Sequence, residues 1–128
     1  RLRSLPTETE WVEFKHNRCE PQELGEYLAA LANSAALAGE PRGYLLFGIE
    51  DGSHQVVGTR FDAHAEKAKG NQDLLPWTAA GLRPNPGFEV RSVEHPDGRV
   101  VLFDVGPARD LPVAFYGTAY VRIGASKT

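Results

Sequence analysis

Three acidic residues and one lysine have the types and spacing that could hold a divalent cation beside a phosphate. Glu8 and Glu13 lie five residues apart, and Lys15 follows two residues after Glu13. Asp51 stands where a long apolar run has just ended. Carboxylate oxygens are ligands that Mg²⁺ and Mn²⁺ accept, and such a metal ion can activate water while a lysine offsets charge on a phosphate. The alternative is an ordinary Glu–Lys ion pair on an exposed strand.

Two predicted strands must position these residues. Residues 43–49 form a continuous apolar run bounded by turn formers, which is typical of a central strand buried on both faces. Gly43 and Gly48 in this run leave room for another backbone to approach. Residues 10–15 alternate between apolar and polar side chains, which predicts a second strand. Because α/β sheets commonly bind ligands at the ends of central strands, a shared site requires these two strands to lie in one sheet.

Two helical regions are predicted. In the first, Leu24, Leu28 and Leu31 fall at helical spacing behind Pro21, which suits a first helical turn. Residues 21–36 are therefore predicted as an amphipathic helix that packs on the sheet.

The second helical region has two predicted parts. Asp62 is suited to cap a short polar helix over residues 63–69. Residues 72–82 are apolar enough for a further helical piece, which Pro76 must start or kink.

The remaining patterns are those of short strands. A brief returning strand is predicted at residues 55–58. Residues 88–93 and 99–105 are predicted as a hairpin around a Pro-Asp-Gly turn, and residues 113–123 as a closing hairpin. The sequence thus predicts one α+β domain over residues 1–128, a mixed α/β fold with a largely antiparallel sheet.

Composition and charge limit the function classes. A chain of 128 residues with 41% hydrophobic content is ordinary for one globular domain, and no run approaches the length of a membrane span. Cys19 is the only cysteine, so no intrachain disulfide is possible and a cytoplasmic location is expected. A net charge of −3 argues against a strong non-specific nucleic-acid binder but leaves room for a local basic patch. The chain begins at Arg1, and we expect it to be a domain of a longer protein.

Several basic side chains could contact phosphate groups of a nucleic acid. They are Arg42, Lys67, Lys69, Arg83 and Arg122. The alternative is a solvated face of mixed charge, in which Arg122 pairs with one of the acids. No glycine-rich phosphate loop is present, so nothing supports ATP binding.

Three ordered motifs now combine. The chain opens with Glu8-x4-Glu13-Phe14-Lys15, continues with Ala32-Asn33-Ser34 and the run from Gly43 to Gly52, and closes with Pro112, Tyr116 and Tyr120-Val121-Arg122-Ile123-Gly124-Ala125-Ser126. Together they resemble the Schlafen-type AlbA-like domain, the second AlbA family, over nearly the whole chain.

The resemblance implies a mixed α/β domain of bacterial regulators and Schlafen proteins, often assigned to DNA binding. Some Schlafen members are metal-dependent endoribonucleases acting on transfer and ribosomal RNA. Their catalytic acids correspond here to Glu8, Glu13 and Asp51, which would also be the Mg²⁺ or Mn²⁺ ligands. Because Schlafen nucleases clamp RNA between two lobes and this chain has one, a homodimer is expected.

We therefore expect a nucleic-acid-binding domain, for DNA or RNA, of a transcriptional-regulator-like protein. One alternative is a metal-dependent ribonuclease, which needs its three acids within one coordination shell. A second is a protein-interaction or dimerisation domain, which the acidic balance supports and which needs an exposed apolar patch.

Overall fold

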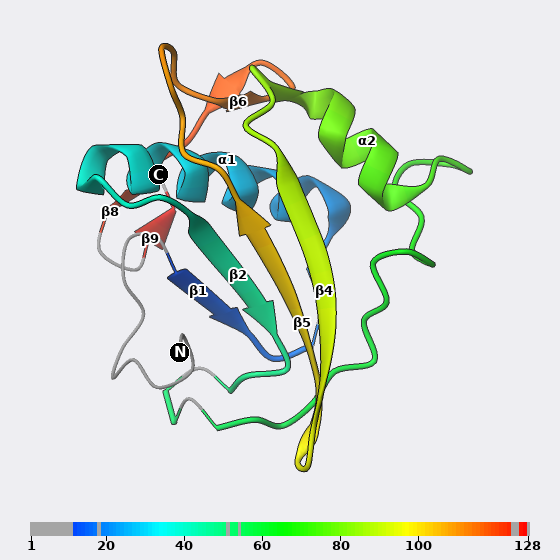
Figure 1. The fold of residues 1–128 in the computed structure, drawn as a ribbon. Helices are drawn as coiled ribbons and strands as arrows, with labels where there is room; N and C mark the ends of the chain where they lie inside the picture. Colours follow the sequence, from blue (N-terminus) through cyan, green and yellow to red (C-terminus); the bar gives the residue numbers. More distant parts are fainter. Residues whose placement is uncertain (1–11, 18, 51, 54, 124–125, 128) are drawn as a thin grey trace.

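The structure is a computed structural model. It describes most of the chain, namely residues 12–17, 19–50, 52–53, 55–123 and 126–127. A four-stranded sheet forms its centre, with the strands in the spatial order β1 (Val12–Lys15), β2 (Gly43–Phe47), β5 (Gly98–Val105) and β4 (Phe88–His95) (Figure 1). β1 and β2 run parallel, whereas the other neighbours are antiparallel. The two strands expected to share a sheet are therefore direct neighbours, and β2 is an interior strand.

α1 (Pro21–Ala38) covers one face of this sheet (Figure 1). Pro21 occupies the first turn, where a backbone amide has no helical partner, and Leu24 is only 1% exposed. Gly39 ends the helix in the left-handed region with a φ of 72°, as C-terminal glycines commonly do. The helix predicted over residues 21–36 is confirmed and extends two residues further.

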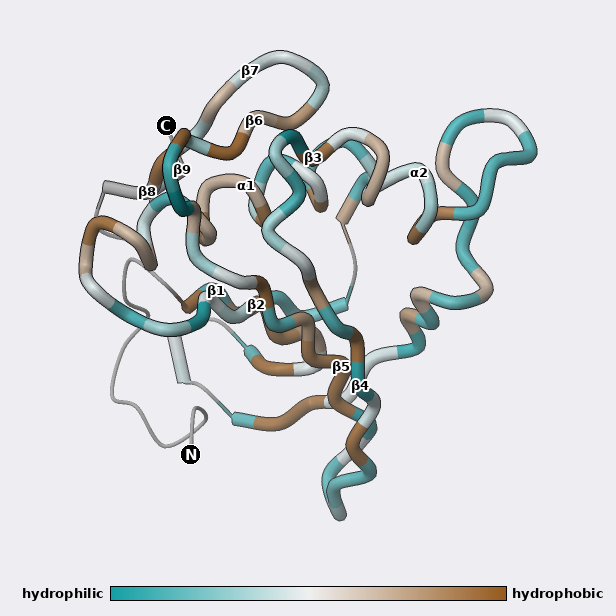
Figure 2. Tube along the Cα trace, turned by 45° about the horizontal axis from the view of Figure 1, so that its top comes forward, coloured by the Kyte–Doolittle hydropathy of each residue, from teal (hydrophilic) through white to brown (hydrophobic). Residues whose placement is uncertain are grey.

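Apolar side chains fill both faces of the sheet. Between the sheet and α1, the rings of Phe47 and Phe61 lie 4.6 Å apart, centre to centre, with Phe103 beside them. On the opposite face, Val12 and Phe14 of β1 are at most 1% exposed and belong to a second cluster. Figure 2 shows β2 and β5 as hydrophobic and the tip of the β4–β5 hairpin as hydrophilic. A strand buried on both faces is what a continuous apolar run predicts.

Both glycines of the central run serve close approaches of the backbone. A Cβ atom at Gly43 would lie 2.9 Å from the carbonyl oxygen of Leu31 in α1. A Cβ atom at Gly48, where φ is 98°, would lie 2.7 Å from the carbonyl oxygen of Arg99. Side chains at these positions would push α1 and β5 away from the central strand.

A group of smaller elements packs along α1 and around it. These elements are α2 (Leu74–Gly81), β3 (Leu82–Arg83), β6 (Ala114–Phe115), β7 (Thr118–Ala119), β8 (Arg122–Ile123) and β9 (Ser126–Lys127). β6 pairs with β3 and β7, and β8 pairs with β9. Pro76 lies in the first turn of α2, so this part of the second helical region is confirmed. No helix in the described part of the chain is long and apolar enough to cross a membrane.

The prediction of a polar helix over residues 63–69 is wrong. Residues 63–65 form a turn instead. Asp62 does cap this segment, since its Oδ1 accepts a hydrogen bond from the amide of His64 at 3.1 Å. A hydrogen bond between the side chain of residue i and the amide of residue i+2 closes a local turn that competes with a helix. This segment also has no apolar stripe whose burial would stabilise a helix.

Two strand predictions are only partly correct. The strand over residues 55–58 reduces to a single antiparallel bridge between Ile49 and Val56. The closing hairpin over residues 113–123 forms as β6 and β7, but β8 leaves it to pair with β9.

Candidate functional site

Glu13 and Lys15 lie on the face of β1 that turns toward α1. Glu13 pairs in register with the core residue Leu45, and its side chain is only 8% exposed. Nζ of Lys15 lies 4.0 Å from Oε2 of Glu13 and 4.5 Å from the ring centre of Tyr27 in α1. The pair is therefore enclosed between β1 and the helix, where an ion pair and a cation–π contact hold the ammonium.

The pKa of Lys15 is raised above its ordinary value. Burial by itself lowers the pKa of this ammonium, because burial disfavours the charged form. A hydrogen bond to Tyr27 and the electrostatic interactions with Tyr27, Glu13 and Glu23 more than offset that effect. Lys15 is thus suited to be a permanent cation that stabilises negative charge, and unsuited to be a proton acceptor at neutral pH.

The other two predicted acids, Glu8 and Asp51, lie outside the described residues. Within the described residues, no three His, Cys, Asp or Glu side chains gather to hold a metal ion. The amide of Gly48 donates to the carbonyl of Lys15 at 2.8 Å, so the segment that leads to Asp51 leaves the sheet beside the end of β1. Of the predicted catalytic and metal-binding set, the structure therefore brings Glu13 and Lys15 together, and the full set stays a prediction.

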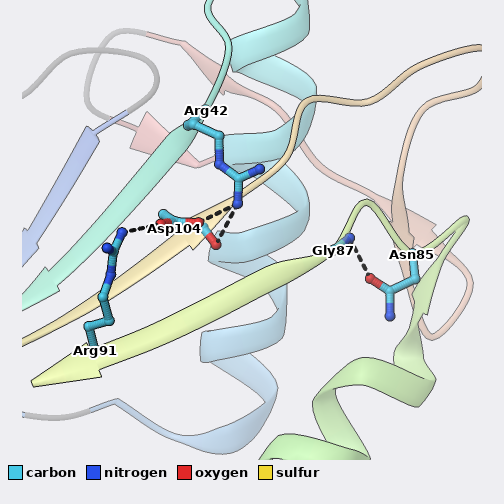
Figure 3. A network of polar contacts seen from close by, with 5 residues as sticks. All are labelled: Arg42, Asn85, Gly87, Arg91 and Asp104. Carbon is cyan, nitrogen blue, oxygen red and sulfur yellow. Dashed lines mark hydrogen bonds and ion pairs between the residues drawn. The ribbon is translucent and has the colours of Figure 1, made fainter.

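Asp104 binds two arginines across three neighbouring strands (Figure 3). Arg42, just before β2, donates to Oδ1 of Asp104, and Nη2 of Arg91 in β4 donates to Oδ2 at 2.8 Å. The carboxylate is 8% exposed, whereas the side chains of Arg42 and Arg91 are 36% and 61% exposed. One buried carboxylate thus orients two guanidinium groups that still reach the surface, and the cluster carries a net charge of +1.

Sequence reasoning predicted Arg42 as a phosphate contact but missed Arg91 and Asp104. A signal was available, because Arg91 occupies a polar position of the alternating strand β4 and Asp104 interrupts the apolar run of β5. Side chains alternate between faces along a strand, so the register that places Arg91 beside Leu102 puts it on the face of Asp104, opposite α1. The contact between Arg42 and Asp104, 62 residues apart, requires the fold.

Two of the other predicted cations, Lys67 and Arg83, make local contacts near α2. Lys67 forms an ion pair with Asp73, and both side chains are more than half exposed. Nε of Arg83 donates to the carbonyl of Ala80 at 3.3 Å, near the end of α2. Lys69 is exposed in the same connection, and Arg122 lies in β8. These contacts are separate from the Asp104 cluster, so the described residues do not join the predicted cations into one network.

Asn33, in the Ala32-Asn33-Ser34 motif, forms hydrogen bonds with the closing segment of the chain. Its Nδ2 donates to the carbonyls of Val113 and Tyr120 at 2.9 and 2.7 Å, and its Oδ1 accepts from the amide of Val113 at 2.7 Å. Its amide group is thus used inside the fold. An apolar groove of about 390 Å³ lies alongside, with Leu37 and Leu111, 80% and 64% exposed, at its lining.

The architecture is that of an α+β domain with a parallel β1–β2 pair in an otherwise antiparallel sheet. Residues 8–128 match the sequence model of the family described as Schlafen, AlbA_2. The chain therefore belongs to the Schlafen, AlbA_2 family, and the resemblance inferred from the three motifs is confirmed. No curated protein matches the chain.

Two solved structures share the fold. The DIP2311 protein from Corynebacterium diphtheriae is 22% identical with a TM-score of 0.52, and the match covers 93% of this chain but only 22% of that protein. The N-terminal domain of a RecG-related protein from Nitrosomonas europaea is 23% identical with a TM-score of 0.56, and the match covers 98% of this chain and 85% of that one. At these identities the similarity concerns the fold alone.

Proposed function

We propose that this Schlafen, AlbA_2 domain binds nucleic acid through phosphate contacts on the face of the sheet opposite α1. The observation that carries the proposal is the Asp104 cluster, where Arg42 and Arg91 are held on either side of one carboxylate (Figure 3). A guanidinium has five N–H donors, so each arginine keeps donors for a phosphate while it binds the carboxylate. The bonds to Asp104 already restrain both arginines, so they lose less conformational freedom when a ligand arrives.

Two further points support this proposal. The RecG-related protein whose N-terminal domain shares the fold has a name that relates it to an ATP-dependent DNA helicase. The chain as a whole carries a net charge of −3, so a cluster of charge +1 is a local exception where a phosphate backbone would be attracted. Lys67, Lys69, Arg83 and Arg122 would add peripheral contacts, and the domain would serve a transcriptional-regulator-like protein in the cytoplasm.

Fluorescence anisotropy with labelled duplex DNA, single-stranded DNA and structured RNA at low salt tests the proposal. Arg91→Gln leaves Asp104 paired with Arg42, so the fold is retained while one charged contact is lost. We expect its Kd to rise about tenfold, because hydrogen bonds to charged groups are worth about 1.5–3 kcal/mol. Arg109→Gln removes the same charge from an exposed side chain outside the cluster and serves as the matched control. Absence of wild-type binding to all three probes would refute the proposal.

Metal-dependent ribonuclease activity is a second proposal, which one observation favours. Glu13 and Lys15 share one face of β1, so a carboxylate and an ammonium already lie together. The described residues supply one of the three acids that the family resemblance implies, and they do not by themselves make a metal site. The test is to incubate structured RNA and Mn²⁺ in three separate reactions, with the wild-type chain, with Glu13→Gln and with Asp51→Asn. Cleavage by the wild type alone supports a nuclease, and equal, negligible cleavage by all three leaves a binding domain.

A further inference from the structure

A polar cleft of about 380 Å³ opens where β1 ends and the β4–β5 hairpin turns. Its walls come from three segments that are distant in sequence, namely residues 16–17, 57–60 and 98–99. These segments converge at the lower end of the sheet in Figure 1. The cleft lies away from the Asp104 cluster, because Arg42 precedes β2 whereas residues 16–17 follow β1, which runs parallel to β2.

The lining of this cleft is basic and polar. Arg60 and Arg99 line it together with His16, Asn17 and Thr59. None of the described residues that line it is acidic. In a chain of net charge −3, two arginines in one cleft whose described lining holds no carboxylate favour an anion there.

Two backbone segments of the cleft lining come into close contact at Gly58 and Gly98. A Cβ atom at Gly98, where φ is 141°, would lie 2.5 Å from the Cα of Gly58. A Cβ atom at Gly58, where φ is 81°, would lie 3.0 Å from the Cα of Gly98. Only glycines allow this approach, which brings the segment of Arg60 against the segment of Arg99.

The walls are fixed by hydrogen bonds. Nη2 of Arg99 donates to the carbonyl of Phe61 at 2.7 Å, so one edge of this guanidinium is anchored. The amide of Thr59 donates to the carbonyl of Arg99 at 2.9 Å, and Oγ1 of Thr59 donates to the carbonyl of Asn17 at 2.6 Å. The remaining donors of Arg99 and the exposed side chain of Arg60 can both reach a ligand in the cleft.

We propose that this cleft binds one phosphate group of a nucleic-acid backbone, with Arg60 and Arg99 as the charged donors and Asn17 as a neutral one. The proposal rests on the proposed function for the source of the phosphate. No Phe, Tyr or Trp is among the described residues lining the cleft, so it offers no platform on which a base could stack. The contact is therefore one to the backbone, independent of base sequence, and it gives the domain a second anchoring point.

Binding of duplex DNA across a salt series provides the first test. Arg60→Gln removes an exposed charge, and we expect Kd to rise about tenfold at low salt. The slope of the logarithm of the association constant against the logarithm of the salt concentration is negative. It should become less steep by about 0.9, as expected for one lost phosphate contact on B-DNA. Arg60→Lys should keep most of the slope, and Arg109→Gln should behave like the wild type. The affinity of Arg99→Gln is interpreted only if its thermal midpoint matches that of the wild type, because Arg99 also donates a hydrogen bond to the carbonyl of Phe61.

Amide chemical shifts measured during titration with inorganic phosphate provide the second test. We expect shifts at residues 16–17, 58–60 and 98–99 in the wild type and none in Arg60→Gln. If the wild type binds DNA and Arg60→Gln keeps the same affinity and salt slope, the cleft proposal is overturned while the proposed function stands. If duplex DNA, single-stranded DNA and structured RNA all fail to bind but phosphate shifts these amides, the proposed function fails and the cleft remains an anion site. If phosphate shifts no cleft amide and Arg60→Gln binds DNA normally, the cleft binds no phosphate.

Discussion

Replacing Asn33 by alanine should destabilise the domain far more than replacing an exposed asparagine. Asn33 lies in α1, is 8% exposed, and makes three hydrogen bonds to the backbone at Val113 and Tyr120. Asn33→Ala leaves the amide and carbonyl of Val113, a residue 1% exposed, without these partners. Each buried backbone group left unsatisfied costs about 1–3 kcal/mol.

The expected net loss follows from these contributions. The carbonyl of Tyr120 belongs to a half-buried residue beside the groove, so water can replace part of its bond. Alanine also favours the helix by about 0.5 kcal/mol relative to asparagine. The free energy of unfolding should therefore fall by about 3 kcal/mol, which lowers the thermal midpoint by roughly 10 °C for a domain of this size.

Asn85→Ala is the matched control. Asn85 is exposed, and its side chain also bonds the backbone, donating to the carbonyl of Ala79 at 3.3 Å and accepting from the amide of Gly87 at 2.8 Å (Figure 3). Because water can take over both bonds, its loss should be at most about 1 kcal/mol. Urea unfolding of both variants, followed by circular dichroism, gives the comparison. Equal losses for the two variants would refute the reasoning that burial decides the cost.

Three further predictions concern packing, charge and assembly. Gly43→Ala should lower the free energy of unfolding by about 1–3 kcal/mol, because its Cβ meets the backbone of Leu31 at 2.9 Å; an unchanged thermal midpoint would contradict this. The raised pKa of Lys15 contributes stability that is fully present below the pKa of unfolded lysine, about 10.4, and is lost as pH rises through the higher folded pKa. The free energy of unfolding of Lys15→Met, measured with urea, should therefore decline less above pH 10 than that of the wild type. Parallel declines would count against this role of Lys15. The chain is also expected to form a homodimer, which sedimentation equilibrium over a range of concentrations checks and a monomer throughout would rule out.

Local patterns in the sequence determined the main elements. The leucine spacing behind Pro21 predicted α1, and the apolar run from Gly43 predicted an interior strand with close backbone neighbours. Alternation predicted β1 and β4, and the Pro-Asp-Gly turn predicted β5 as the strand paired with β4. These predictions succeed because burial of an apolar face over several turns or residue pairs dominates the local preferences.

Only the tertiary structure decided which polar side chains meet. Asp62 closes a turn where a helix was predicted, because a single side-chain bond outweighs weak propensity when no apolar face is buried. Arg42 joins Asp104 across 62 residues, and Asn33 joins Val113 across 80. Arg60 and Arg99 share a cleft because two glycines let their segments touch. Such contacts depend on strand register and chain crossing, and those are set by long-range packing that residue spacing does not encode.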